Sequence, residues 1–292
     1  MKGWTLSTFV LATIAGCGGS EAPAPPAEDF QDLTTLDYTV SPGQERYLCY
    51  TFRSPAEQKA ITRVEPIQGQ VVHHVALFRT TSEEPEGFFE CPEIIRLNWQ
   101  PVWAGGAGAD PLTLPDDVGF VVEPETQYLV QYHVQNTRAA DVTERSTIRL
   151  TYGSDPAAVQ PAGIFALGAL SLTIPPATAG FEQVVECSAD RELNVFAVFP
   201  HMHKLGKSVR LDVGKTAADA EVAYAKEPWV FGEQPMEPVD LAVSDGDFLR
   251  STCRWDNPGA TEVTFGESSE DEMCITVLFY YPFTGLAGCI GL

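Results

Sequence analysis

Histidine is the residue type whose number and placement point most clearly to chemistry. The chain has only five, and each lies inside or at the end of a short apolar run with the character of a β-strand: His73, His74, His133, His201 and His203. Burying a bare imidazole in such a run is costly unless the ring gains a partner. The histidines are therefore the first candidates for a functional site.

The sharpest motif is His201-Met202-His203. Residues i and i+2 of a strand face the same side of a sheet, so these two imidazoles form a clasp for one metal ion. Pro200 directly precedes them and is typical of a strand edge, which favours the alternative of two exposed histidines at a strand end. Taken alone, the motif leaves both interpretations open.

The first half of the chain offers the pair His73-His74 and the single His133. Neighbours on a regular strand point to opposite faces, so the pair reaches one ion only if the backbone is strongly twisted or different ring nitrogens are used. A lone histidine in an alternating strand is usually a hydrogen-bonded core residue. Only together do the three residues indicate one site with three imidazole ligands.

A third ligand for the second half must come from another residue type, and the chain has four methionines. Met202 points away from the face that its histidine neighbours share, and Met236 lies in a proline-rich loop. Met273 opens an apolar run that a sheet can hold rigidly, although ordinary core packing is the stronger explanation from sequence alone. Imidazole suits zinc, copper, iron and nickel, whereas a thioether favours Cu(I), so both sets together suit copper in two oxidation states.

Short alternating or apolar runs, separated by Pro, Gly, Asp and Asn, predict the strands that position these residues. The runs cover residues 46–52, 70–78, 119–122, 127–134, 146–152, 193–198, 208–213 and 273–281. Their lengths and spacing predict an all-β fold of two antiparallel, jelly-roll-like β-sandwich domains packed side by side. The single candidate helix, residues 216–225, could equally be a loop. A Gly-Ser-Asp-Pro break separates a first domain, residues 31–156, from a second, residues 157–292.

The first residues have the character of a targeting segment. A positive start and an apolar stretch end at Ile14-Ala15-Gly16-Cys17, which is similar to a bacterial lipobox, with an ordinary secretory signal as the alternative. We expect a signal peptide at residues 1–16, lipidation of Cys17 and a flexible tether at residues 17–30. The protein is thus expected to be exported and lipid-anchored in the bacterial cell envelope, in the periplasm or on the cell surface.

The net charge limits the classes of binding partner, and the cysteine content indicates disulfides. The formal net charge of -22 argues against nucleic acid and anionic lipid headgroups, so membrane contact is expected only through the anchor. Without Cys17, six of the seven cysteines remain, and an even number in an exported chain predicts disulfides. None forms a C-x-x-C pair, so thiolate metal sites are not expected.

In their order and spacing, the motifs resemble those of the copper type II, ascorbate-dependent monooxygenases, which include peptidylglycine α-hydroxylating monooxygenase and dopamine β-hydroxylase. The resemblance runs from about Tyr47 to Cys289. It rests on Tyr47-Leu48-Cys49, His73-His74-Val75-Ala76-Leu77-Phe78, Val118-Gly119-Phe120, Gln131-Tyr132-His133, His201-Met202-His203-Lys204-Leu205-Gly206-Lys207, Gly246-Asp247, and Asp271-Glu272-Met273-Cys274 with Tyr280-Tyr281. It implies two β-sandwich domains, each contributing one copper centre.

The resemblance also implies a role for each ligand. His73, His74 and His133 would hold the electron-supplying copper, and His201, His203 and Met273 the catalytic copper that binds oxygen. Ascorbate would supply one electron to each copper, and the second electron would cross an interdomain gap. Three disulfides follow from the same resemblance: Cys49–Cys91, Cys187–Cys289 and Cys253–Cys274.

These implications lead to an expected function. We expect a copper-dependent monooxygenase with two copper ions per chain and ascorbate or an equivalent reductant, which hydroxylates a C–H bond of a small-molecule substrate with O2. The alternative is an envelope protein that binds or delivers copper on the same scaffold.

The sequence departs from the peptide-hydroxylating members at the positions where those bind a substrate carboxylate. An arginine, an asparagine and a tyrosine are replaced here by Phe199, Ile275 and Val277, while Gln131 is retained. A peptide carboxylate would lose its partners at these positions. We therefore expect a more apolar pocket and a small apolar or aromatic substrate rather than a glycine-extended peptide.

Overall fold

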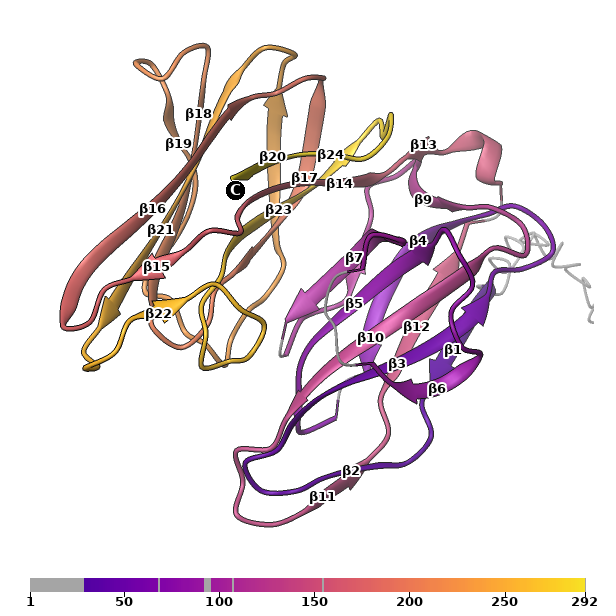
Figure 1. Ribbon diagram of the computed structural model, residues 1–292. Coiled ribbons are helices and arrows are strands. Elements are labelled where there is room, and N and C mark those ends of the chain that lie inside the picture. Colours follow the sequence, from indigo (N-terminus) through magenta and orange to yellow (C-terminus); the bar gives the residue numbers. More distant parts are fainter. Residues whose placement is uncertain (1–28, 68, 92–95, 107, 154, 292) are drawn as a thin grey trace, which may run out of the picture.

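The computed structural model describes residues 29–291 except 68, 92–95, 107 and 154. Two β-sandwiches lie side by side, and the chain passes from the first to the second once (Figure 1). The described residues form no α-helix, only a 3-10 turn at Pro156–Ala158. The predicted signal peptide, Cys17 and most of the predicted tether lie outside the described residues.

The first domain contains two main sheets and a small ribbon. One sheet has the order β1-β12-β4-β9-β13, with β8 beside β4. Its strands are β1 (Asp29–Thr34), β12 (Thr147–Tyr152), β4 (Lys59–Ile67), β9 (Val118–Val122), β13 (Gln160–Pro161) and β8 (Leu112–Thr113). The other sheet contains, in order, β6 (Gly87–Glu90), β3 (Glu45–Arg53), β10 (Gln127–Gln135), β5 (Val72–Thr80) and β7 (Trp99–Gly106). The ribbon pairs β2 (Tyr38–Val40) with β11 (Val142–Glu144).

The second domain repeats this plan. Its first sheet contains, in order, β20 (Glu237–Val243), β17 (Leu193–His201), β23 (Cys274–Tyr281), β14 (Gly163–Ala169) and β24 (Ala287–Gly291). Its second sheet contains, in order, β16 (Thr178–Ser188), β21 (Phe248–Asn257), β18 (Gly206–Gly214) and β19 (Glu221–Lys226). A ribbon pairs β15 (Thr173–Ile174) with β22 (Val263–Thr264).

The all-β sandwich architecture and all eight predicted strands are confirmed, and the structure differs from the expectations in four details. The candidate helix at residues 216–225 is wrong, because its second half forms β19, which pairs with β18 and buries Tyr224. Asp29 and Phe30 of the expected tether belong to β1, where they pair with Tyr152 and Thr151 of β12. The first domain extends beyond residue 156, because β13 pairs with β9. That pair and β14–β24 are parallel rather than antiparallel.

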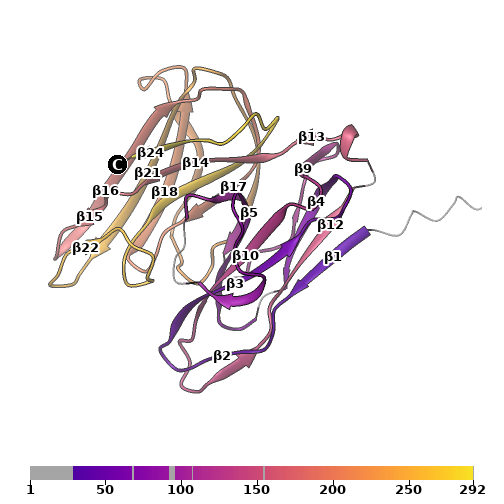
Figure 2. The same ribbon diagram turned by 45° about the vertical axis from the view of Figure 1, so that its right-hand side comes forward.

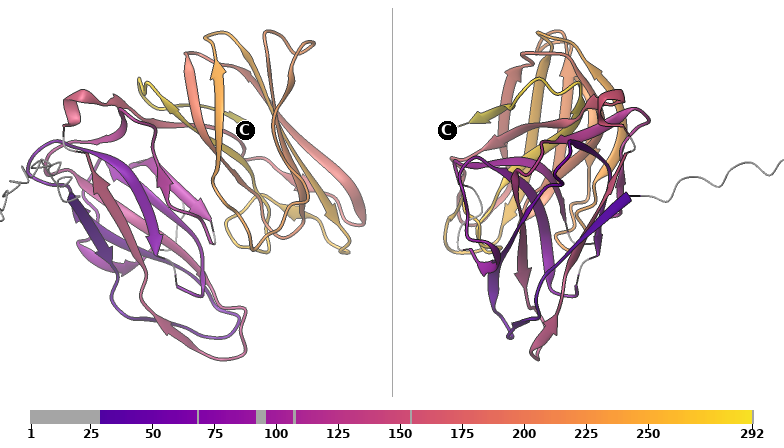
Figure 3. Two further views of the ribbon diagram at one scale, coloured as in Figure 1. Left: turned by 180° about the vertical axis from the view of Figure 1, so that it is seen from behind. Right: turned by 90° about the vertical axis from the view of Figure 1, so that its right-hand side faces the viewer.

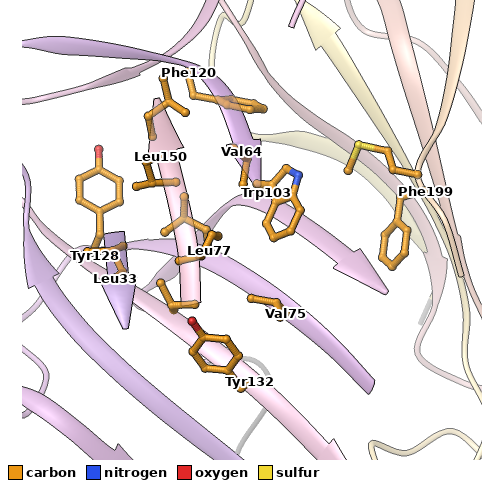
Figure 4. Close-up of a cluster of buried hydrophobic side chains, with 14 of the residues drawn as sticks. Leu33, Val64, Val75, Leu77, Trp103, Phe120, Tyr128, Tyr132, Leu150 and Phe199 are labelled. Carbon is orange, nitrogen blue, oxygen red and sulfur yellow. The ribbon is translucent and has the colours of Figure 1, made fainter. Parts of the chain in front are cut away.

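Strand β10 explains how a sandwich can present polar groups to a buried site. Tyr128, Val130, Tyr132 and Val134 belong to the first-domain core, whereas the alternate residues of β10 point to the opposite face of the sheet. That face is also buried: Leu129 packs there with Cys49, Cys91 and Trp99 of the first domain, and His133 lies at the end that meets the second domain. Figure 4 shows the core cluster, with Tyr128 and Tyr132 among Leu77 and Leu150.

The interface between the domains is largely apolar. Strands β5 and β7 of the first domain lie beside β14 and β17 of the second (Figures 1 to 3). Strand β7 contacts both β14 and β17. One continuous hydrophobic cluster joins the first-domain core to Ile164, Phe199, Val277 and Phe279. Figure 4 shows Phe199 on the second-domain side of this cluster. Such contact between sheet faces positions side chains of one domain against those of the other.

Three disulfides brace the sandwiches. They join Cys49 to Cys91, Cys187 to Cys289 and Cys253 to Cys274, which are the pairings that the family resemblance implies. The last of these links β21 to the first residue of β23, directly after Met273. Disulfides are typical of exported proteins. Within the described residues, no helix has the length and apolar character needed to cross a membrane.

Candidate metal centre

The first histidine set lies on β5 and β10, which are neighbours in one sheet. His74 pairs with His133, but Val72 pairs with Val134, so His73 is the extra residue of a β-bulge. The bulge breaks the alternation that would otherwise send His73 and His74 to opposite faces. One ring nitrogen from each of the three histidines lies within 4.8 Å of the others. The structure therefore brings together the three predicted ligands of the first domain.

The His133 ring is held on three sides. Its Nε2 lies 2.6 Å from Glu45 Oε1, its Nδ1 lies 3.3 Å from His74 Nδ1, and the Tyr47 ring stacks on it at 4.4 Å. Burial raises the pKa of Glu45, but hydrogen bonds from His133 and the Ser269 backbone lower that pKa overall to about 2. Because Glu45 is an ionised acceptor, we assign the His133 proton to Nε2, which leaves the Nδ1 lone pair facing His74.

The second set lies at the end of β17, whose last residue is His201. His201 Nδ1 donates to Gln234 Oε1 at 2.7 Å, and His203 Nδ1 donates to the Asp271 carbonyl at 3.1 Å. The Gln234 amide is itself oriented, because its Nε2 donates to the carbonyl of Phe231 at 2.9 Å. Both histidines therefore carry the proton on Nδ1 and present the Nε2 lone pair. These two Nε2 atoms are buried and find no hydrogen-bond partner among the described residues.

Glu272 fastens this pair of histidines to the segment that carries Met273. Its buried carboxylate accepts hydrogen bonds from the backbone N–H of His203 at 2.9 Å and of Leu205 at 2.6 Å, and from Trp255 Nε1 at 2.8 Å. Burial raises the pKa of Glu272. Met273 is 1% exposed and lines the same cavity as His201. The third ligand role of Met273 stays a prediction, and the shared lining of one cavity by Met273 and His201 is compatible with it.

The two sets are not separated by the gap that the resemblance implies. Ring centroids of His74 and His201 lie 5.4 Å apart, and those of His73 and His203 lie 6.2 Å apart. Phe231 of the second domain packs against His73 at 4.5 Å. All five histidines of the chain therefore form one buried cluster at the domain interface.

Burial lowers the pKa values of His73, His74, His201 and His203. Desolvation, followed by the charge of neighbouring imidazoles, lowers the pKa of His73 to about 3. Desolvation lowers the pKa of His203 to about 4, although its hydrogen bond to Asp271 acts in the opposite direction. The pKa values of His74 and His201 lie well below the usual range for the same primary reason, burial. Neutral imidazole is the form that binds metal ions.

The residues present fit copper. Buried ring nitrogens of His73, His201 and His203 find no hydrogen-bond partner among the described residues, and an unsatisfied buried polar atom costs about 1–3 kcal/mol. A bound metal ion would satisfy them. Imidazoles with one nearby thioether suit copper better than magnesium or calcium, which prefer oxygen ligands.

An apolar cavity of about 220 Å³ adjoins the cluster at the domain interface. The four predicted pocket residues, Gln131, Phe199, Ile275 and Val277, all line it. Three of the six predicted metal ligands also line this cavity: His74, His201 and Met273. Other lining side chains are mostly aliphatic or aromatic: Ala76, Phe78, Trp99, Trp103, Ile164 and Leu170. The part of these residues in substrate binding stays a prediction.

The sequence analysis did not predict three residues that position the histidines: Glu45, Gln234 and Glu272. Glu272 belongs to the Asp271-Glu272-Met273-Cys274 motif, so its place beside Met273 was a usable signal. Glu45 lies two residues before Tyr47, outside every motif, and Gln234 lies in a proline-rich loop. Their roles depend on contacts between distant segments, which no local pattern encodes.

Comparison with known proteins shows similarity to copper monooxygenases. A family model described as "Copper type II ascorbate-dependent monooxygenase, C-terminal domain" matches residues 160–291. The chain is 25% identical to DBH-like monooxygenase protein 1 of Gallus gallus, over 92% of this chain and 50% of that protein. It is 24% identical to the Homo sapiens protein of the same name, over 89% of this chain and 48% of that one.

Dopamine beta-hydroxylase of Canis lupus familiaris is 24% identical over 89% of this chain and 47% of its own length. The chain thus spans about half the length of the curated relatives it matches. A solved structure of the infectious bursal disease virus VP2 particle aligns with 87% of this chain and 72% of that chain at 7% identity, but its TM-score of 0.22 is too low to carry an argument. Residues 160–291 thus match the C-terminal domain of the copper type II, ascorbate-dependent monooxygenases, and the similarity to these relatives covers 89% to 92% of the chain.

Proposed function

We propose that this protein is a copper- and ascorbate-dependent monooxygenase that uses O2 to hydroxylate a C–H bond of a small apolar or aromatic molecule. One observation carries the proposal: two buried histidines of the cluster, His74 and His201, line an apolar cavity of about 220 Å³ together with Met273. Ligands for a redox metal and room for a substrate therefore meet at one place.

Two copper ions per chain are part of this proposal. His73, His74 and His133 hold one, and His201, His203 and Met273 hold the other. Bound copper supplies the redox chemistry, namely electron transfer and the activation of O2. A thioether favours Cu(I), so the set with Met273 is suited to the reduced state. The three-imidazole set is suited to exchanging electrons with ascorbate or a similar reductant.

The chain's own residues prepare this site. Gln234 and the Asp271 carbonyl fix the His201 and His203 rings so that each Nε2 faces the interior. Such outer contacts orient metal-binding histidines and raise their basicity. Glu272 holds the backbone of His203, and hence the spacing between the two rings and Met273. Burial of the cluster excludes water from the reacting centre.

The cavity favours a neutral substrate. Among the described residues that line it, none carries a formal charge at neutral pH, and Gln131 is the one amide. A charged group would lose its solvation there without a counter-charge. An engineered cavity of about 150 Å³ binds benzene, so a cavity of about 220 Å³ is large enough for one substituted aromatic ring.

The cellular setting proposed here follows from the amino terminus. The signal peptide at residues 1–16 and a lipid on Cys17 would place the folded domains outside the cytoplasm, on the bacterial cell envelope. The three disulfides support export. No nucleic acid partner is proposed, because the net charge is -22.

The test is oxygen uptake by the copper-loaded protein with ascorbate, across a panel of neutral aromatic compounds, amines and peptides ending in glycine. We expect neutral aromatic compounds to accelerate oxygen uptake and to yield one hydroxylated product per O2 consumed. Comparable turnover of glycine-ending peptides would contradict the proposed substrate class. Uptake that never depends on substrate, together with transfer of copper to an acceptor protein, would favour copper delivery instead.

A further inference from the structure

We propose that Glu45 is a positioning residue that couples the two histidine sets. It fixes the His133 ring and fastens the segment of residues 267–272, which leads into Met273, to the first domain. The importance of this coupling for catalysis rests on the proposed function. The coupling itself is a property of the metal-free chain.

Glu45 touches a predicted ligand of one domain and the backbone of the other. Its Oε1 accepts from His133 Nε2 at 2.6 Å and from the Ser269 backbone N–H at 3.0 Å. Its Oε2 accepts from Ser268 Oγ at 3.3 Å and Ser269 Oγ at 3.5 Å. One carboxylate therefore serves as the shared acceptor of both domains.

This contact is not an ordinary surface ion pair. The His133 side chain is fully buried and the Glu45 side chain is 20% exposed. Exposed ion pairs contribute little because water competes for both partners. Here the partners are a buried imidazole and a backbone N–H, so losing the carboxylate would leave two buried donors unsatisfied.

Two neighbours of Glu45 reinforce the same junction. Tyr47 stacks on His133, and its hydroxyl donates to the Glu267 carbonyl at 2.6 Å. Gln135, which is opposite Glu45 in the β3–β10 ladder, donates from Nε2 to Ser269 Oγ at 2.5 Å. Three first-domain side chains thus hold residues 267–269 of the second domain.

The held segment is continuous with the second histidine set. Asp271 accepts from His203 Nδ1 through its carbonyl, and Glu272 accepts from the His203 backbone. Met273 comes next. Ser269 and Asp271 therefore lie two residues apart but contact different histidine sets. Ser269 contacts the first set through Glu45, and Asp271 contacts His203 of the second set directly. Moving the domains apart would remove the donors of Ser268 and Ser269 from Glu45 and release the segment that spaces His203 and Met273.

The test compares metal-free wild type with Glu45→Ala and Glu45→Gln. Two quantities are measured: amide hydrogen exchange of residues 267–272, and the tautomer of His133 from ¹⁵N NMR of the five imidazoles. In the wild type we expect His133 to carry its proton on Nε2 and Ser269 N–H to be protected. In Glu45→Ala we expect exchange at Ser269 to accelerate at least tenfold and the His133 tautomer to become mixed. The tautomer is a readout that a purely structural contact would not move.

Glu45→Gln keeps the shape of the side chain but offers a single, neutral acceptor oxygen to His133 and Ser269. We expect exchange at Ser269 to rise at least threefold, so this variant decides the question should Glu45→Ala fail to fold. The matched control is Glu270→Gln in the same segment, whose carboxylate is exposed and pairs with Lys204 Nζ. It should match the wild type in both measurements.

Wild-type exchange at Ser269 and a wild-type His133 tautomer in the folded Glu45 variants would overturn the proposal. Because copper is absent throughout, that result would leave the proposed monooxygenase function untouched. Conversely, failure of the oxygen-uptake test would leave the coupling by Glu45 standing.

Discussion

The two histidine sets lie within one cluster but are built differently. His73, His74 and His133 come from two paired strands of one sheet, where a β-bulge aims adjacent histidines at one point. His201 and His203 leave the end of a strand, and their third predicted partner, Met273, lies just before another strand. A ring of the first set is held by an ionised carboxylate, Glu45, whereas neutral acceptors hold the two rings of the second set.

This difference suggests a division of labour. Three imidazoles beside a carboxylate suit a metal ion that changes oxidation state without changing ligands. Two imidazoles with a thioether and neutral outer partners favour Cu(I). His201 and Met273 also line the apolar cavity together with Phe199 and Val277. His74 is the one predicted ligand of the first set that lines it. We propose that the second set is the one that meets substrate and oxygen, and the following tests ask whether the two sets are separable in this way.

The largest expected effect comes from removing the thioether. We expect Met273→Ile to lower the rate of hydroxylation by at least about a thousandfold, because interactions of the reacting centre are worth several kcal/mol. Copper in the first set should remain bound, as measured by metal analysis beside the assay. The control is Met236→Ile, another buried methionine of the second domain, which should stay near wild-type activity. Equal loss of both coppers in Met273→Ile would refute the assignment of two sites.

A second effect is the response of the metal-free protein to acid. Burial lowers the pKa of His203 from 6.5 to about 4, so between these pH values the unfolded chain binds a proton that the folded chain does not. The free energy of unfolding should therefore fall as the pH falls from about 6.5 through about 4, by roughly 3 kcal/mol for this group.

The check is denaturant unfolding of wild type and His203→Asn in the presence of a chelator, at about pH 6.5 and about pH 4.5. The wild type should lose more stability than the variant on acidification. An identical loss in both proteins would show that His203 is not held neutral by burial. Glu45 adds a separate decline at lower pH, because its pKa of about 2 lies below the ordinary 4.5.

The fold was largely predictable from sequence, because alternating apolar residues identify a strand from its own local sequence. The bulge at His73 was not predictable, since it depends on the register between β5 and β10. The ligands could be named from the histidines and the family resemblance. Their contacts with Glu45 and Gln234 could not, because those contacts join segments far apart in sequence. The closeness of the two sets also depends on domain packing, which no motif encodes.

A third test asks how much the hydrogen bond between His201 and the neutral amide of Gln234 contributes to copper binding. Gln234→Leu should weaken copper binding at the second set by about 10- to 100-fold and leave the first set unchanged, because His201 loses the acceptor that fixes its tautomer. Competition with a Cu(I) chelator measures both affinities. Gln127→Leu removes a buried amide that bonds Thr80 and Glu84 in the first domain, so it is the matched control. Weakening of both sets alike would argue that they are one site.

The smallest expected effect concerns the cavity. Val277→Ala removes two methyl groups from its wall and should lower kcat/KM for an apolar substrate by about 5- to 20-fold, through weaker apolar contact. Steady-state kinetics measure this change. Val222→Ala, at an exposed position of β19, should have no effect. A cavity variant with unchanged kcat/KM would place the substrate elsewhere.

The most direct test of the account is the number of copper ions bound per chain in wild type, His74→Ala and His203→Ala. Ring centroids of the two sets lie as close as 5.4 Å, so the copper count distinguishes one mixed site from two separate sites. We predict two copper ions in the wild type and one in each variant, with the remaining ion in the intact set. A single ion in the wild type, or loss of all copper in either variant, would contradict the assignment of one copper centre to each domain.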